Sequence, residues 1–205
     1  MFRLQVEQLS KNYNRHKVFD NLSFSHSKGV LGISGANGSG KSTLLKCLAF
    51  LLRPKTGTIL WSKDEVNYSK ENSKTLMGYS APYINLYDEL TLIENLRFLK
   101  TVSGLSNDVA PILSLLEYVE IDKLGDHLFK NLSTGQQQRA KLAASLVRNP
   151  EILFLDEPGS NLDTKGHALV ENIVKDQNEA GTFVVIASND PEEIKLCDQV
   201  IQLHD

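Results

Sequence analysis

Hydrophobic and polar residues alternate in the first third of the chain, at the period of two that is typical of half-buried β-strands. This alternation predicts strands at residues 3–9, 18–25, 30–34 and 58–61. The period then becomes helical, because Leu92, Leu96 and Leu99 share one helical face, as do apolar residues between 112 and 119. The stretch from about residue 82 to residue 130 is therefore predicted to be mostly helical.

The last part of the chain returns to strands and helices in alternation. Residues 152–155 and 183–187 are apolar without alternation, which favours parallel strands that are covered on both faces. A helix at about 164–178 and a strand at 200–203 complete the pattern. The sequence thus predicts an α/β fold with a mainly parallel sheet, an antiparallel N-terminal β region and a small helical insertion.

Composition narrows the possible partners. The 205 residues are 41% hydrophobic and 23% charged, as in an ordinary globular protein of one domain. The formal net charge of −3 gives no concentrated basic surface, so we expect no nucleic-acid partner. The longest apolar stretch, residues 44–52, contains a lysine and is shorter than the roughly 20 residues that span a bilayer. We therefore expect no segment that crosses a membrane alone.

A glycine-rich loop follows the strand at 30–34 and opens a helix predicted over residues 41–52. The loop reads Gly35-Ala36-Asn37-Gly38-Ser39-Gly40-Lys41-Ser42, and Thr43 comes next. In such loops the glycines turn backbone N–H groups toward phosphates, the lysine adds charge for the β- and γ-phosphates, and the serine hydroxyl ligates Mg²⁺. Ser39 and Thr43 are expected to add contacts. A glycine-rich turn without a ligand is the alternative, which the match of every fixed position disfavours.

Two carboxylates follow the apolar run at 152–155. Asp156 ends the predicted strand, where a carboxylate reaches the coordination sphere of Mg²⁺, usually through water. Glu157 lies one residue further on, where it can accept a proton from an attacking water. Two exposed acids at a strand end are the alternative, which the complete phosphate loop makes less favourable.

A second motif ends about a dozen residues before the apolar run at 152–155 and reads Leu132-Ser133-Thr134-Gly135-Gln136-Gln137-Gln138-Arg139. Ser133 and Gln136 fit an S-x-x-Q capping box, which predicts the start of a helix. Capping boxes are common, so local physics alone leaves open whether the motif does more than start a helix.

Together, the glycine loop, this second motif and the Asp-Glu-Pro segment closely resemble the ATP-binding cassette subunits of ABC transporters, from about residue 4 to residue 203. The resemblance implies one P-loop ATPase domain over residues 1–205, with a helical subdomain inserted at about 82–147. It implies ATP and Mg²⁺ as cofactors, and two copies that clamp ATP as a homodimer or a heterodimer. In such a dimer the γ-phosphate bound by one copy meets the other copy's residues Ser133, Thr134, Gly135 and Gln136, at the positive end of a helix.

The resemblance assigns roles to three more positions. Tyr13 corresponds to an aromatic residue that stacks on adenine, although a surface tyrosine at a strand end is the alternative. Asp163 belongs to a segment at the dimer interface. Thr134 stands where the family more often has glycine, but the neighbouring Gly135 is kept, so we expect the motif to function.

Two positions depart from the family pattern. Pro82 falls where a glutamine usually follows the strand at 76–80, and proline offers no side-chain ligand. Asn189 stands in place of a switch histidine; its amide can hydrogen-bond a γ-phosphate but cannot become cationic. We therefore expect ATP to bind normally, with hydrolysis that is slow or strongly dependent on a partner. The alternative is a binding-only regulatory subunit, against which the retained Glu157 argues.

The resemblance also implies a membrane partner. We expect a cytoplasmic ATPase, peripheral on the inner face of the cell membrane through a separate integral membrane transporter subunit. An apolar cluster either receives that subunit or packs the helical insertion's own core. Its members are Tyr83, Ile84, Leu86, Tyr87 and Leu90. A soluble, non-transport ABC ATPase is a competing function, but relatives of that kind carry large insertions or a second cassette that these residues do not include.

Overall fold

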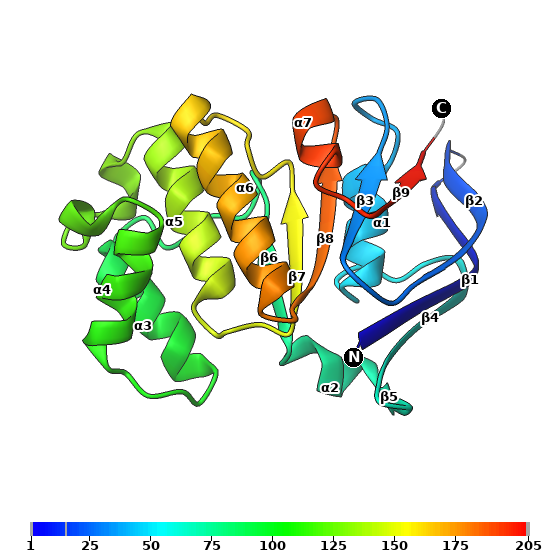
Figure 1. Ribbon diagram of the computed structural model, residues 1–205, viewed down its shortest axis with the longest axis horizontal. Coiled ribbons are helices and arrows are strands. Elements are labelled where there is room, and N and C mark those ends of the chain that lie inside the picture. Colours follow the sequence, from blue (N-terminus) through cyan, green and yellow to red (C-terminus); the bar gives the residue numbers. More distant parts are fainter. Residues whose placement is uncertain (1, 15, 204–205) are drawn as a thin grey trace.

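Two β-sheets and a group of helices form the molecule in the computed structural model, which describes residues 2–14 and 16–203. Figure 1 shows the two sheets next to each other, with most of the helices gathered at the end away from the chain termini. The larger sheet therefore lies between the smaller sheet and most of the helices.

The smaller sheet is antiparallel, in the order β2-β1-β4-β5. Its strands are β1 (Phe2–Tyr13), β2 (His16–His26), β4 (Thr56–Lys63) and β5 (Val66–Tyr68). Alternation along β1 buries Phe2, Leu4 and Val6. Strict alternation would then turn Leu9 outward. The register shifts between Val6 and Leu9, and Gln8 has a φ of 49°, so a bulge returns Leu9 to the core.

The larger sheet is parallel, in the order β6-β7-β8-β3-β9. Its strands are β6 (Met77–Ser80), β7 (Ile152–Asp156), β8 (Phe183–Ser188), β3 (Val30–Ser34) and β9 (Gln199–Gln202). Every residue of β7 and β8 is buried, as the two unbroken apolar runs predict. The predicted α/β fold with an antiparallel N-terminal β region is thereby confirmed.

The helices differ widely in length. They are α1 (Lys41–Leu48), α2 (Lys70–Lys74), α3 (Leu92–Val102), α4 (Val109–Tyr118), α5 (Thr134–Leu146), α6 (Thr164–Glu179) and α7 (Pro191–Ile194), with short 3₁₀ turns at η1 (Asp122–Leu124) and η2 (Phe129–Asn131). Among these described residues, no helix is both long enough and apolar enough to cross a membrane.

The helix predicted over residues 41–52 ends at Leu48, so the predicted end is wrong by one turn. Phe50 adopts a left-handed φ of 55°, and the backbone N–H groups of Leu51 and Leu52 both donate to the carbonyl of Lys46. These bonds close the helix in the manner of a left-handed C-terminal cap. Leu51 and Leu52 therefore belong to the turn after the helix, although their apolar side chains continue the helical pattern of the sequence.

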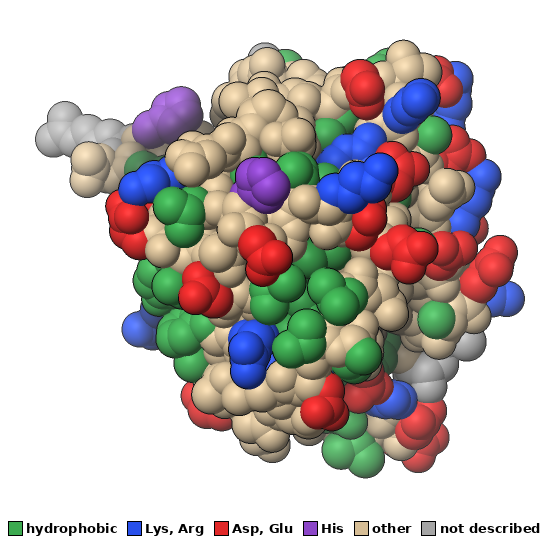
Figure 2. Space-filling model, turned by 90° about the vertical axis from the view of Figure 1, so that its left-hand side faces the viewer, with side chains coloured by type: hydrophobic (Ala, Val, Ile, Leu, Met, Phe, Trp, Pro, Cys, Tyr) green, Lys and Arg blue, Asp and Glu red, His purple; other side chains and the backbone are tan. Residues whose placement is uncertain are grey.

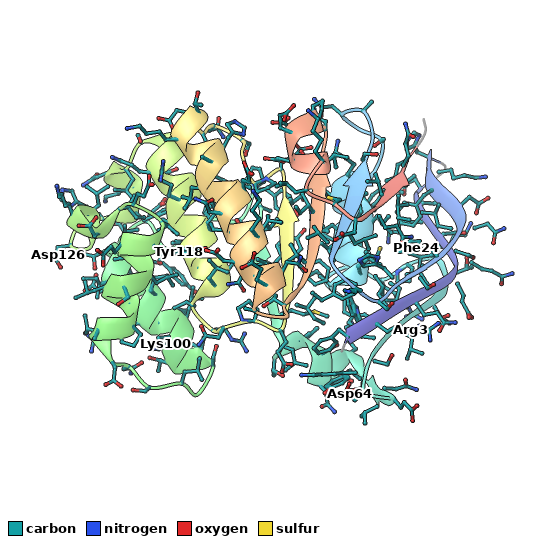
Figure 3. All side chains as sticks on the ribbon, in the orientation of Figure 1. Arg3, Phe24, Asp64, Lys100, Tyr118 and Asp126 are labelled. Carbon is teal, nitrogen blue, oxygen red and sulfur yellow. The ribbon has the colours of Figure 1, made fainter. Side chains whose placement is uncertain are left out.

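Two hydrophobic cores cover the two faces of the parallel sheet. Alternate residues of β7 divide between them, with Leu153 and Leu155 facing α3 to α6 and Phe154 facing α1 and the antiparallel sheet. In Figure 3, Tyr118 lies among the helices and Phe24 in the antiparallel sheet at the opposite end. The carboxyl ends of β3, β7 and β8 meet at the upper edge of Figure 1, and this edge carries the chemistry.

Candidate functional site

The glycine loop connects the end of β3 to the start of α1. Gly38 and Gly40 have φ angles of 91° and 100°, which side chains rarely adopt. A Cβ atom added to Gly38 would meet nothing within 4 Å, so this side of the loop is open to a ligand. Thr43 lies half-buried in the first turn of α1, behind the loop.

Lys41 lies beneath this loop and is only 5% exposed. Its Nζ donates to the carbonyls of Gly35 and Ala36, at 2.9 and 3.2 Å, and forms an ion pair with Glu157 Oε1 at 3.2 Å. The loop thus holds a buried cation whose countercharge is a glutamate from another strand end. An anionic ligand at the loop competes with that glutamate for the cation.

The Ser39 hydroxyl is buried and has no hydrogen-bond partner among the described residues. A buried polar group without a partner costs about 1–3 kcal/mol. An acceptor from a phosphate held in the loop would offset this cost. The loop therefore fits a phosphate group on geometry as well as on its motif.

Asp156 is completely buried at the end of β7. The Ser42 hydroxyl donates to its Oδ1 at 2.9 Å, and the Tyr83 hydroxyl donates to its Oδ2 at 2.8 Å. Burial raises the pKa of Asp156 above its ordinary value, against the lowering effect of these two hydrogen bonds. A carboxylate and a serine hydroxyl are the oxygen donors that Mg²⁺ prefers, so the two fit that ion.

Glu157 turns away from Asp156, because its backbone has a left-handed φ of 46°. Its side chain is 27% exposed and reaches Lys41 with one carboxylate oxygen. The other oxygen accepts longer contacts from the Ser188 hydroxyl at 3.4 Å and the Asn189 backbone N–H at 3.5 Å. The two neighbouring carboxylates therefore lie in different environments: Asp156 is buried, whereas Glu157 is partly exposed to solvent.

Asn189 and Tyr13 approach the glycine loop from different sheets. The Asn189 amide donates to Asn37 Oδ1 at 3.0 Å, so the position expected for a switch residue contacts the loop directly. Tyr13 is 49% exposed at the end of β1, where it pairs with His16. β2 then continues to Val18, whose side chain would lie 2.4 Å from a Cβ on Gly40. Tyr13 therefore lies at the end of the antiparallel sheet that is nearest the glycine loop.

The capping box predicted at the second motif is present. The Ser133 hydroxyl accepts from the Gln136 N–H at 3.3 Å, and the Gln136 side chain accepts from the Ser133 N–H at 2.9 Å. Ser133 and Thr134 are exposed, and Gly135 lies close to the carbonyl of Asn161. Figure 1 shows that α5 begins at the same upper edge as the glycine loop, with α6 and α7 between them.

The start of α5 is joined to the segment between β7 and α6. The Gln138 amide donates to the Pro158 carbonyl at 2.8 Å, and Arg139 lies 3.9 Å from Asp163. Asp163 also accepts from the Gly166 N–H at 2.9 Å and so caps α6. The second motif is therefore mechanically linked to the strand end that carries both carboxylates.

Tyr83 is the site residue that the sequence did not reveal. The sequence groups it with apolar neighbours of a possible docking surface, but its hydroxyl turns to the Asp156 carboxylate instead. The local signal was its position directly after Pro82, where the family resemblance leads us to expect a site residue. No pattern within that segment could show which side chain turns inward.

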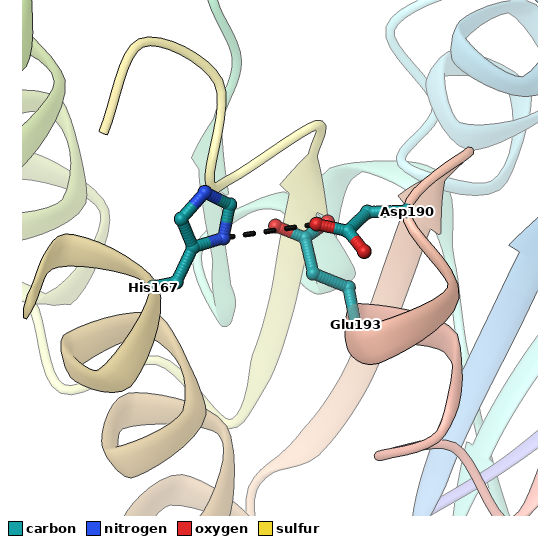
Figure 4. A group of neighbouring side chains, drawn as sticks. All are labelled: His167, Asp190 and Glu193. Carbon is teal, nitrogen blue, oxygen red and sulfur yellow. Dashed lines mark ion pairs between the residues drawn. The ribbon is translucent and has the colours of Figure 1, made fainter. Parts of the chain in front are cut away.

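A charged cluster that the sequence also did not reveal lies beneath the segment after Glu157. Figure 4 shows His167 of α6 facing Asp190 and Glu193 of the α7 region. Their ligand atoms lie within 4.8 Å of one another, and His167 Nδ1 is 3.7 Å from Asp190 Oδ2. Glu193 is buried and accepts from the Gly159 N–H at 2.8 Å, while burial raises its pKa. The cluster links α6 to the loop that carries Asn189.

Comparison with known proteins identifies this arrangement. The sequence model of the family described as ABC transporter matches residues 19–160, more than half of the chain. The chain belongs to the ABC transporter family. It therefore carries the ATP-binding and ATP-hydrolysing domain of that family, as the sequence motifs imply.

Individual ABC relatives cover nearly all of the chain. The lipoprotein-releasing system ATP-binding protein LolD of Cytophaga hutchinsonii is 35% identical over 91% of this chain and 90% of its own. The probable multidrug ABC transporter ATP-binding protein YbhF of Escherichia coli is 30% identical over 96% of this chain, which spans only 35% of YbhF. The dimeric ATP-binding cassette MJ0796 bound to ADP and Pi superimposes with a TM-score of 0.86 at 25% identity, over 98% of this chain and 94% of that one.

Proposed function

We propose that this chain is an ATP-hydrolysing subunit that dimerises around Mg²⁺ and ATP and powers movement of a substrate by a separate transmembrane subunit. The observation that carries the proposal is the convergence at one sheet edge of a phosphate loop, a buried cation and two divergent carboxylates. Lys41, Asp156 and Glu157 come from two different strand ends, and all lie in contact with the loop or its first helical turn.

ATP binding begins with an exchange of partners at Lys41. Its ammonium forms an ion pair with Glu157 Oε1 at 3.2 Å. The β- and γ-phosphates replace this carboxylate as the countercharge, while the loop N–H groups and the start of α1 receive the phosphate oxygens. Glu157 is thereby released toward the γ-phosphate side, where a catalytic base is needed.

Mg²⁺ would be held by Ser42 and Asp156, which already contact each other. When bound, the ion supplies positive charge that neutralises the β- and γ-phosphate oxygens. Glu157 is the group that accepts a proton from the attacking water. Its other carboxylate oxygen remains near Ser188 and Asn189 in this role, so the end of β8 and the residue after it orient the base.

The second copy completes the site. The exposed Ser133 hydroxyl and the N-terminus of α5 form an anion-binding end that faces solvent, not the chain's own loop. We assign this end, with Thr134, Gly135 and Gln136, to the γ-phosphate held by a partner copy. The dimeric state of the MJ0796 cassette bound to ADP and Pi supports this assignment by analogy.

Hydrolysis is proposed to be slow. Pro82 offers no side-chain group to the metal or the water, and its carbonyl is instead occupied by Lys141 Nζ at 2.7 Å. Asn189 keeps a hydrogen bond to the phosphate loop but supplies no positive charge to a developing phosphate anion. Stabilisation of charge in the transition state is the usual source of rate, so its partial loss lowers kcat more than affinity.

The membrane subunit is proposed to dock beside α3. A cavity of about 220 Å³ lies there, lined by Tyr79, Ile84, Leu86, Tyr87 and Leu99 among others. Asn95, itself buried, holds the adjoining loop through bonds to Tyr87 and Leu90. Figure 2 shows hydrophobic side chains gathered on the face formed by the helical end of the molecule, with charged residues around them. A short apolar segment of a partner fits such a groove.

A binding-only regulatory subunit is the second candidate, and the loss of both the glutamine and the histidine favours it. Phosphate release from Mg²⁺·ATP separates the two. We expect slow turnover in the unaltered protein and none in Lys41→Ala or Glu157→Gln, while Glu179→Gln at the exposed end of α6 behaves as unaltered. Turnover of the unaltered protein no higher than that of Glu157→Gln would replace the proposal with the binding-only candidate.

A further inference from the structure

Hydroxyl groups from two distant segments each donate a hydrogen bond to one oxygen of the Asp156 carboxylate. Ser42 of the phosphate-loop helix donates to Oδ1 at 2.9 Å, and Tyr83 of the loop after β6 donates to Oδ2 at 2.8 Å. The serine is the expected partner of a magnesium-binding aspartate. The tyrosine is not, and it directly follows the proline that stands in the place of glutamine.

Several contacts fix the Tyr83 side chain in this position. Its hydroxyl lies 2.6 Å from the hydroxyl of Tyr79, and Lys46 Nζ lies 3.8 Å above its ring. Because the single proton of Tyr83 is donated to Asp156, Tyr79 donates to Tyr83 in turn. Lys46 belongs to α1, one turn after Ser42, so the ring is clamped by the same helix that carries the metal-binding serine.

The backbone beside Tyr83 is held as firmly as its side chain. Lys141 of α5 is 8% exposed and donates to the Pro82 carbonyl at 2.7 Å. The loop is therefore tied to α1 through the Tyr83 ring and to the helix of the second motif through the Pro82 carbonyl. Its continuation to Tyr87 lines the cavity beside α3.

Packing alone does not account for this placement. The Tyr83 side chain is among the exposed large apolar residues, at 48%, so its ring is not part of either core. Only its polar tip reaches the completely buried carboxylate. A carboxylate oxygen can only accept, so the Tyr83 hydroxyl is the donor of this hydrogen bond.

We propose that Tyr83 is a positioning residue for the magnesium site: its hydroxyl orients the Asp156 carboxylate and connects it to the loop that lines the cavity beside α3, the task for which Pro82 has no side chain. This role rests on the proposed function, because it has meaning only if Asp156 receives Mg²⁺ with ATP.

The test compares Tyr83→Phe, which keeps the ring and its contact with Lys46, with Tyr118→Phe. The control removes the same hydroxyl from a tyrosine of α4 that donates to the Asp176 carboxylate at 2.7 Å, among the helices (Figure 3). The first measurement is the affinity for the nonhydrolysable analogue AMP-PNP, with Mg²⁺ and with EDTA. We expect Tyr83→Phe to leave the EDTA affinity within twofold and to weaken the Mg²⁺-dependent affinity by about tenfold, the lower end of the range for a hydrogen bond to a charged group. Tyr118→Phe should change neither.

The second measurement is phosphate release. We expect Tyr83→Phe to need a higher Mg²⁺ concentration for half-maximal rate, by about the same tenfold factor, and Tyr83→Gln to recover part of this loss. If Tyr83→Phe unfolds more easily, Tyr79→Phe tests the same chain of hydrogen bonds and should shift the Mg²⁺ requirement in the same direction by less.

Identical Mg²⁺ dependence in unaltered protein, Tyr83→Phe and Tyr79→Phe would overturn the role of Tyr83 while leaving the proposed function intact. Failure of the unaltered protein to bind AMP-PNP with or without Mg²⁺ would instead overturn the proposed function, and the role of Tyr83 with it. The two failures are therefore distinguishable in one set of titrations.

Discussion

The ion pair between Lys41 and Glu157 predicts that Glu157→Gln binds an ATP analogue more tightly than the unaltered protein. The carboxylate lies 3.2 Å from a lysine that is almost completely buried, so an incoming phosphate must displace it. Glutamine has the same shape without the charge, and it leaves the ammonium available to the phosphates.

The size of the effect follows from the geometry of the pair. A hydrogen bond to a charged group contributes about 1.5–3 kcal/mol. Glu157 is 27% exposed, and solvent screening reduces the contribution of such a partly exposed pair to about 1 kcal/mol. A difference of this size corresponds to roughly fivefold in the dissociation constant.

The assay is equilibrium binding of AMP-PNP with Mg²⁺, by calorimetry or with a fluorescent analogue, because a nonhydrolysable ligand removes any effect of blocked turnover. Protein concentration is kept low enough that the variant stays monomeric. Glu179→Gln, at an exposed position, is the matched control and should bind as the unaltered protein does. An unchanged or weaker affinity in Glu157→Gln would refute the exchange of partners at Lys41.

Three further predictions concern the same edge of the sheet. Asp156→Asn should raise the melting temperature of the protein without nucleotide by about 2–4 °C, the shift that 1 kcal/mol produces in a domain of this size, and should abolish Mg²⁺-dependent binding. The pKa of Asp156 is raised in the folded state, so the ionised carboxylate costs stability above its ordinary pKa, and this cost is lost as the pH falls. The melting temperatures of the variant and the unaltered protein should therefore converge at low pH. Asn189→His should raise kcat several-fold with little change in KM. An unchanged kcat would show that Asn189 is not a cause of slow hydrolysis. Ser133→Ala should lower the melting temperature by a few degrees, because loss of the helix cap costs about 1 kcal/mol. It should also prevent ATP-driven dimerisation. If the variant dimerised with undiminished affinity, Ser133 would not be part of the partner's nucleotide site.

The sequence predicted the architecture well where the signal is periodic or continuous. The buried strands at Ile152–Asp156 and Phe183–Ser188 follow from unbroken apolar runs, and the start of α5 follows from a capping box that closes within four residues. Such features depend on neighbours in the chain, so the sequence contains what decides them. The end of α1 was missed because the left-handed turn at Phe50 has no glycine to announce it.

Contacts between distant segments explain what the sequence could not reveal. Tyr83 meets a carboxylate 73 positions away, and nothing in its own loop distinguishes it from the apolar residues around it. His167 and Glu193 come together only because α6 and α7 pack at the same edge of the sheet. Residues with such roles become visible once the strand order fixes which chain segments meet.

The most direct test of the account is the molar mass of Glu157→Gln in saturating Mg²⁺·ATP, measured by light scattering on a sizing column, with Lys41→Ala as the control that cannot grip the phosphates. We predict that ATP doubles the molar mass of Glu157→Gln, that ADP does not, and that Lys41→Ala stays monomeric throughout. A Glu157→Gln variant that remains monomeric with ATP bound, both alone and with its membrane partner, would contradict the claim that two copies share each nucleotide.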